Sequence, residues 1–187
     1  MKKRIMDEIR KRYNPRKRSQ GREALSWVLT IAIAIAIAFF FRFFVVEIIR
    51  VDGPSMEDTL YTDEQLVVTK LDYVFGRPER GDIIITKFED REGLIVKRVM
   101  GLPGETIEIK DGNVYINGEK IDDKYATVKP DEPMEPVEIP EGYVFVMGDN
   151  RNNSTDSRVI GPLPMQDIVG VAHFVVYPFD KMKAIGR

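Results

Sequence analysis

The sequence predicts a mostly β protein: a single N-terminal transmembrane helix, then an antiparallel β-sheet domain with a small inserted β subdomain. Two observations carry this prediction. One long apolar stretch lies near the N-terminus. Every later apolar run is short, rich in Val, Ile, Phe and Tyr, and bounded by Gly, Pro, Asn or Asp. The length of 187 residues suits one domain with a small insertion.

The apolar stretch runs for 18 residues, from Ala24 to Phe41, without a charge. As a helix it would span about 27 Å, close to the hydrocarbon thickness of a bilayer. Trp27 and Arg42 lie near its two ends, where such side chains reach the interface. A core helix would show a polar stripe, and a cleaved signal would be shorter and end in small residues. We therefore expect an uncleaved anchor at residues 23–45.

Charge divides the chain at the same place. Residues 1–42 carry 11 Lys and Arg against 3 acids, a net charge of +8, whereas residues 43–187 carry 17 against 27, a net charge of -10. The excess of Lys and Arg before the apolar stretch favours a cytoplasmic N-terminus. We expect a basic cytoplasmic tail at 1–22 and an extracytoplasmic domain at 46–187.

Short apolar runs mark the expected strands of that domain. They lie at 66–69, 82–86, 94–100, 106–109, 113–116, 143–147 and 171–177. Asp111-Gly112 and Asn117-Gly118 predict two tight turns, the first of them in a hairpin. Residues 122–142 are rich in proline and acids, which predicts an extended, exposed connection. The inserted subdomain is expected at about 105–142, and no segment after position 52 shows a sustained helical period.

The residue counts exclude much of the usual catalytic chemistry. Without cysteine the chain has no disulfide, thiolate metal site, iron–sulfur cluster or thiol nucleophile, and one His cannot form a multi-His metal centre. His173 lies inside VAHFVVY, where a packed strand side chain is the simpler interpretation. A Ser-His-Asp triad is therefore disfavoured though not impossible. We expect no cofactor, no metal and no nucleic acid partner.

A neutral lysine is the remaining way to activate a hydroxyl group. Lysine acts as a base only when its ammonium loses a proton, which burial among apolar groups promotes. Lys97 lies in LIVKRVM (94–100), where strand alternation puts it on the face of Ile95 and Val99, with Arg98 on the other face. On these residues alone, a lysine that reaches solvent is the more usual case.

Four further segments occur in order along the chain. They are residues 51–60 (VDGPSMEDTL), 80–84 (RGDII), 97–105 (KRVMGLPGE) and 148–158 (GDNRNNSTDSR). Together, behind an N-terminal anchor, they resemble the single-span branch of the bacterial type I signal peptidases. The resemblance implies a membrane-anchored serine endopeptidase that removes signal peptides from exported pre-proteins and cleaves after small residues. It implies exported pre-proteins and the lipid bilayer as partners.

The resemblance also implies roles for individual residues. Ser55 would be the nucleophile and Lys97 the general base, with Arg98 beside the base. Asp156 and Arg158 would hold the site together. From the residues alone, that last pair is either a surface ion pair in a polar loop or part of a partly buried network.

The hydrogen-bond donors that would stabilise the tetrahedral intermediate are predicted only in part. The N–H of Ser55, in a turn after Gly53-Pro54, is one candidate. Some relatives carry a serine hydroxyl as a second donor two positions before the nucleophile, and Gly53 stands there in this chain. The second donor is left open between the Gly53 backbone and water. Asp58 occupies a position that is often Pro in this motif, which loosens the expected turn.

Two other functions stay open on the sequence. A self-cleaving Ser-Lys protease, like the SOS repressors, would share the related core, but such proteins are soluble and carry the cleaved segment in their own chain. A non-catalytic, membrane-tethered β domain would leave Ser55 and Lys97 with purely structural roles.

Overall fold

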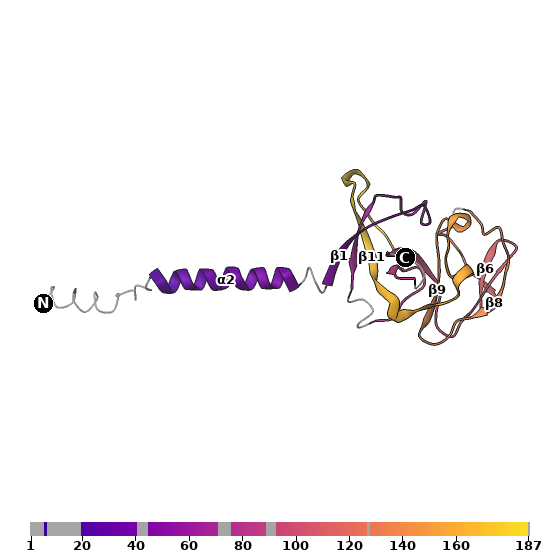
Figure 1. Ribbon diagram of the computed structural model, residues 1–187, viewed down its shortest axis with the longest axis horizontal. Coiled ribbons are helices and arrows are strands. Elements are labelled where there is room, and N and C mark those ends of the chain that lie inside the picture. The colour runs from indigo at the N-terminus through magenta and orange to yellow at the C-terminus, as the bar shows by residue number, and fades with distance from the viewer. Residues whose placement is uncertain are drawn as a thin grey trace. The chain divides into compact units, whose positions relative to one another are not determined.

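The computed structural model describes residues 6, 20–40, 45–70, 76–88, 93–126 and 128–186 (Figure 1). The chain divides into two compact units, Met1–Phe41 and Arg42–Arg187. Most of the basic tail expected at 1–22 lies outside the described residues. So do positions 41–44 of the expected anchor, with Arg42 among them.

The first unit contains helix α2, Gln20–Phe40. Its 18-residue window Glu23–Phe40 has a mean hydropathy of 2.1, and none of it is buried by the rest of the protein. Leu, Ile and Phe side chains are exposed on all sides of the helix. A helix that is apolar all round suits a lipid environment, and this one has the length and composition to cross a membrane.

The second unit is built on an antiparallel sheet with the strand order β1-β2-β11-β3-β4-β9-β10, and β12 pairs with β11. Strand β11 comes late in the chain but lies between β2 and β3, so segments far apart in sequence meet in one sheet (Figure 1). The strands are β1 Val46–Arg50, β2 Gln65–Thr69, β3 Ile83–Thr86, β4 Ile95–Gly101, β9 Tyr143–Met147, β10 Leu163–Pro164, β11 Ile168–Tyr177 and β12 Lys183–Ala184. The predicted fold class is confirmed.

A second, four-stranded sheet has the order β7-β6-β5-β8. Its strands are β5 Thr106–Lys110, β6 Asn113–Ile116, β7 Glu119–Lys120 and β8 Met134–Glu138. Asp111 and Gly112 connect β5 to β6 and both have positive φ angles, of 50° and 67°. Asn117 and Gly118 connect β6 to β7 and also both have positive φ angles, of 51° and 81°. Positive φ at both central residues is what a tight hairpin turn demands. Both predicted turns are confirmed.

The prediction for residues 122–142 was wrong in part. Residues 134–138 are not a free connection but form β8, which pairs with β5 at the edge of the second sheet. Pro136 lies inside this strand, and an edge position tolerates proline because its missing N–H is not needed by a further strand. One helical turn, α4 (Ser157–Ile160), also occurs after position 52. It is too short to produce a periodic pattern.

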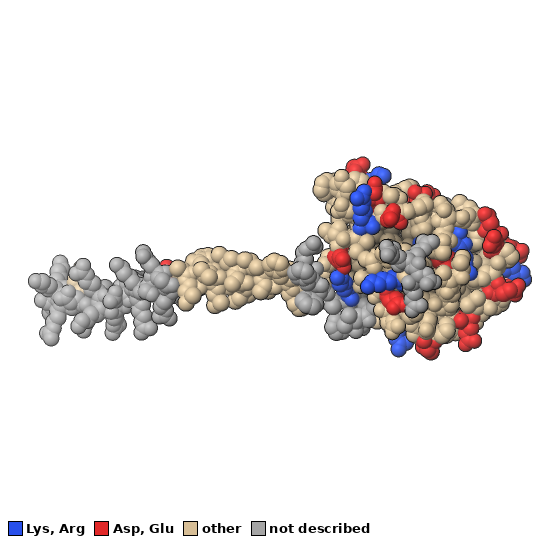
Figure 2. Space-filling view, in the orientation of Figure 1, with Lys and Arg blue, Asp and Glu red and all other residues tan. Residues whose placement is uncertain are grey.

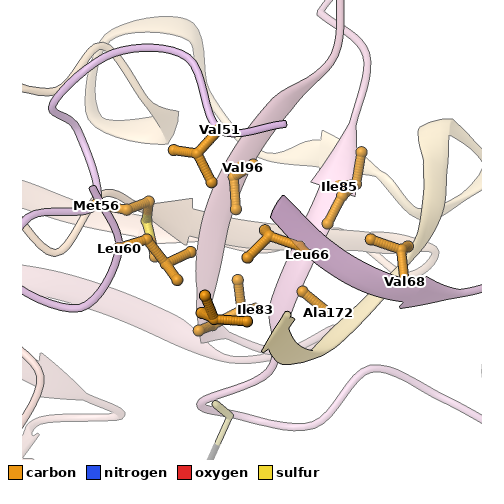
Figure 3. Packing of buried hydrophobic residues seen from close by; sticks show 10 residues of the cluster. Val51, Met56, Leu60, Leu66, Val68, Ile83, Ile85, Val96 and Ala172 are labelled. Carbon is orange, nitrogen blue, oxygen red and sulfur yellow. The ribbon is translucent and has the colours of Figure 1, made fainter. Parts of the chain in front are cut away.

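The described residues pack around three apolar clusters. The first joins β2, β3, β4 and β11 to the segment 51–60 (Figure 3). The second lies under the second sheet and includes Ile107, Ile109 and Phe145, and the third includes Ile84, Val99 and Val146. Segment 51–60 has no regular strand of its own and is fixed by this packing.

Acidic side chains gather on the visible surface at the end where β6 and β8 lie (Figure 2). Residues 105–142 carry 11 acids against 4 lysines, a net charge of -7. They therefore account for most of the -10 of residues 43–187. The remainder of that part of the chain, which includes the first sheet, is close to electrically balanced.

Candidate active site

Ser55 lies on a turn that is anchored on both sides. Before it, the Val51 N–H donates to the Glu64 carbonyl at 2.8 Å, and the Val51 side chain is buried. After it, Met56 and Leu60 are 1% and 0% exposed and point into the first cluster (Figure 3). Because its neighbours are held in the core, the half-buried Ser55 has a defined position at the surface of that core.

Lys97 approaches this turn from β4. Its side chain is buried, with 4% of the residue exposed, and a hydrogen bond of 2.6 Å joins its Nζ to Ser55 Oγ. Ile95 and Val99 contribute to the third cluster whereas Val96 contributes to the first, as alternation along a strand requires. The structure thus brings together two residues that are 42 positions apart in the sequence.

Arg98, the next residue, is 1% exposed and makes a bidentate ion pair. Its Nε and Nη2 donate to the two carboxylate oxygens of Asp149 at 2.8 and 2.7 Å. Its Nη1 donates to the Gly81 carbonyl at 2.7 Å and to the Gly186 carbonyl at 3.2 Å. The centroid of the Tyr125 ring lies 3.8 Å from the guanidinium carbon. Arg98 therefore ties β4 to the segment that follows β9.

Asp156 and Arg158 form an ion pair, with Arg158 Nε and Nη2 each 2.8 Å from a carboxylate oxygen of Asp156. The same carboxylate accepts from the Gly148 N–H at 2.9 Å and the Ser154 hydroxyl at 2.8 Å. Burial raises the pKa of Asp156, but Arg158, the Gly148 amide and the Ser154 hydroxyl together lower it, and the net pKa lies below the ordinary 3.8. The pair belongs to a buried network and is not a surface bridge.

The loop after β9 touches the Ser55 turn directly. The Asn150 N–H donates to the Ser55 carbonyl and the Asn150 side-chain amide donates to the Pro54 carbonyl, both at 3.1 Å. Gly148 passes so close that an added Cβ would overlap the Ser55 carbonyl oxygen and the Ser154 hydroxyl. Only glycine allows this approach. Ser154 and Asn150 were not predicted as individual site residues, and only their membership of the segment 148–158 pointed to them.

Gly53 borders open space. Its φ angle is +90°, and no heavy atom lies within 4 Å of the point where a Cβ would stand. It presents no side-chain donor to the site.

In the described chain, β3 pairs with β4 over residues 95–98, while β9 pairs with β4 only from Arg98 onward. The β9-side edge of Ile95 and Val96 therefore has no registered strand partner among the described residues.

His173 lies in β11, where its Nε2 is 2.8 Å from the Thr69 hydroxyl. The interpretation as a packed strand side chain agrees with this position. Within the described part of the chain, no three His, Asp or Glu side chains form a group that could hold a metal ion.

A family model and two relatives that cover most of this chain agree on one family. The family model described as signal peptidase, peptidase S26, matches residues 24–177. Signal peptidase I of Bacillus licheniformis is 39% identical over 168 residues, covering 84% of this chain and 90% of that protein. Signal peptidase I T of Bacillus subtilis is 40% identical over 170 residues, covering 85% and 88%. A signal peptidase I crystal structure from Enterococcus faecalis has 34% identity and a TM-score of 0.45, covering 51% of this chain and 96% of that one.

Proposed function

The chain belongs to the signal peptidase family, peptidase S26, and is a serine endopeptidase that removes signal peptides; on that premise we propose that Ser55 is its nucleophile and Lys97 its general base. The observation that carries the proposal is the 2.6 Å hydrogen bond between Lys97 Nζ and Ser55 Oγ. A base must lie within about 2.6–3.2 Å of the group whose proton it removes. This pair meets that condition.

The reaction proceeds in two halves. Ser55 Oγ attacks the scissile carbonyl carbon while neutral Lys97 takes the hydroxyl proton, and the carbonyl oxygen becomes an oxyanion. The resulting ammonium gives that proton to the leaving amine as the peptide bond breaks, which releases the mature protein. A water molecule then loses a proton to Lys97 and attacks the acyl-enzyme. Collapse of the second intermediate returns the proton to Ser55 and releases the signal peptide.

The surroundings of Lys97 favour the neutral amine that this mechanism needs. The side chain is buried, and removal from water penalises the charged form of a lysine. Arg158 sits on the carboxylate of Asp156 and offsets the negative charge of that buried group.

The oxyanion needs donors that are already in place. We assign one to the Ser55 N–H, on the turn fixed by Met56 and Leu60. The second donor is either the Gly53 backbone or water, because Gly53 supplies no hydroxyl group. In other enzymes, the loss of one such donor slows the reaction by about 10²–10³-fold.

The substrate adds as an extended strand. Among the described residues, no strand pairs with Ile95 and Val96 of β4 on the side of β9, and Lys97 of the same strand contacts Ser55. Backbone hydrogen bonds to such an edge give affinity, and shallow pockets select alternate side chains. Small residues at the first and third positions before the scissile bond fit this mode, as the family resemblance implies.

Helix α2 anchors the enzyme in the membrane, with the N-terminus in the cytoplasm and residues 46–187 outside. Its apolar window of Glu23–Phe40 supports the anchor. The charge of +8 in residues 1–42 supports the orientation. A signal peptide that emerges from the outer face of the membrane would meet the active site there.

The full-length protein in detergent, incubated with a pre-protein, tests the proposal. We expect a single cut after a small residue, and no cut by Ser55→Ala at equal concentration. Thr62→Ala is the matched control, because it removes a hydroxyl group from an exposed residue on the turn before β2. Its activity should match that of the unaltered chain.

The alternatives give different results in the same assay. A tether without catalysis would leave the pre-protein intact. A self-cleaving protease would cut its own chain and leave the added pre-protein intact. Normal cleavage by Ser55→Ala would contradict the assignment of the nucleophile while leaving the family membership untouched.

A further inference from the structure

Residues 183–186 return to the catalytic region after the chain has completed β11. Strand β12 pairs with β11, with Ala184 opposite Phe174 and Lys183 opposite Val175. The Ile185 N–H then donates to the His173 carbonyl at 2.8 Å. These bonds fix one side of the segment to the sheet. Its other contacts reach the two parts of the chain that carry Ser55 and Lys97.

Three contacts make that connection. Lys183 Nζ donates to the Thr59 carbonyl at 2.7 Å, on the turn that follows Ser55. Ile185 packs against the first cluster, to which Met56 and Leu60 of the same turn belong. The Gly186 carbonyl accepts from Nη1 of the buried Arg98, the residue after Lys97, at 3.2 Å.

These contacts matter because the Ser55 turn is not part of a strand. A cavity of about 430 Å³ lies along the segment, lined in part by Thr59, Arg98, Tyr125 and Lys183. The segment and the turn therefore meet through a few specific contacts beside this cavity. Core packing and Asn150 also hold the turn, so the loss of a contact to residues 183–186 allows a small shift rather than its release. Catalysis is sensitive to such shifts, since a displacement of about 1 Å can cost 10²-fold in rate.

We propose that residues 183–186 form a strap that holds the Ser55 turn in register with Lys97, and that Lys183 is a positioning residue for the nucleophile. This inference rests on the proposed Ser-Lys mechanism. The strap acts on the placement of Ser55 and touches no reacting atom. Loss of the strap should therefore lower the rate at which bound substrate is cleaved more than it weakens the binding of substrate along β4.

The first test replaces the charged end of the strap in the full-length protein. Lys183→Met keeps the aliphatic stem and removes the donor, so we expect kcat to fall by about 10- to 100-fold with KM little changed. Lys183→Arg restores a donor to the Thr59 carbonyl and should recover most of kcat. Lys110→Met removes an exposed lysine from β5 in the second sheet and should leave both constants unchanged.

The second test loosens the strap without altering charge. Ile185→Ala should lower kcat, whereas Ile121→Ala, which trims a partly buried isoleucine against the second cluster, should lose comparable stability and keep its kcat. Lys183→Met and Ile185→Ala with kcat close to that of the unaltered chain would overturn the strap. So would an equal fall in kcat for Ile121→Ala. Ser55→Ala is measured alongside, since its retained activity would instead refute the proposed mechanism.

Discussion

Two residues of the site have opposite electrostatic needs. In the proposed mechanism Lys97 must be neutral to accept a proton, whereas Asp156 must be charged to hold its network. Burial favours the neutral form of both groups. For Asp156 that penalty is overcome by Arg158, Gly148 and Ser154, which donate to its carboxylate. The partners of the Asp156 carboxylate thus keep it charged despite its burial.

The Arg158–Asp156 pair should contribute to stability in a pH-dependent way. The pKa of Asp156 lies below its unfolded value near 3.8, so the pair stabilises the fold above that pH and the contribution disappears as pH falls through the lowered pKa. Arg158→Met should therefore reduce the free energy of unfolding by about 1.5–3 kcal/mol at pH 7. The loss should shrink at about pH 3. Denaturant unfolding of the full-length protein in detergent measures both values.

Arg50→Met is the matched control for that experiment. Its ion pair with Asp63 is exposed, with 67% and 66% of the two side chains accessible, and solvent screens such pairs. It should change stability little at either pH. An Arg158→Met loss that is the same at both pH values would mean that Asp156 does not titrate as described.

Residue-scale features differ in how far the sequence predicts them. Ser55, Lys97, Asp156 and Arg158 are singled out by motifs, because those segments have recognisable residue types at fixed short spacing. The bidentate partner of Arg98 is not predictable in this way. Asp149 lies 51 positions further on, and only the pairing of β4 with β9 brings it to the guanidinium.

At the scale of elements, the site depends on where β9 ends. The strand stops at Met147, and the chain then turns over the Ser55 carbonyl. Gly148 permits the contact because it has no side chain. Because β9 ends there, no strand in the described part of the chain pairs with that side of β4 at Ile95 and Val96, where the substrate strand is proposed to add.

Gly148→Ala tests this arrangement. The new methyl group would overlap the Ser55 carbonyl and the Ser154 hydroxyl, so the loop must move away from the turn. We expect a loss of about 1–3 kcal/mol in stability, as overpacking commonly gives, together with a large fall in kcat. Thermal melting and steady-state cleavage, both on the full-length protein, measure the two effects.

Gly170→Ala is the matched control for Gly148→Ala, because it should lower stability without moving the Ser55 turn. An added Cβ there would overlap the Thr69 carbonyl, so the overpacking is similar but lies between β11 and β2. Its stability should fall while kcat, measured well below the melting temperature, stays near normal. Equal losses of kcat in the two variants would show that Gly148 has no special relation to the nucleophile.

Local turns are predictable from the sequence, whereas the pairing of distant strands is not. The Asp111-Gly112 and Asn117-Gly118 turns are local, because positive φ angles at two adjacent residues strongly restrict the sequence. The pairing of β11 with both β2 and β3 is not local and follows from packing across the whole domain. Strand β8 was missed because proline and acids hide an edge strand whose ladder bonds use only one side.

At the scale of the whole molecule, charge and hydropathy predict an orientation. Residues 1–42 carry +8 and the apolar window of α2 follows the basic tail. Protease added to intact spheroplasts should therefore degrade residues 46–187 and leave a small membrane-protected fragment. Lysed spheroplasts are the control and should lose the fragment's cytoplasmic tail as well. Protection of the entire chain in intact spheroplasts would reverse the proposed orientation.

The central claim is that Lys97 acts as a base, and replacing it with arginine tests that claim most directly. Lys97→Arg keeps the positive charge and the long stem, but guanidinium stays protonated at any working pH. Pre-protein cleavage by the full-length protein should fall by about 10²–10⁴-fold. Lys97→Met, which is neutral and easily buried, should fail equally and keeps the test decisive if arginine disturbs folding. Near-normal cleavage by either folded variant, verified by circular dichroism and melting, would contradict the Ser-Lys mechanism.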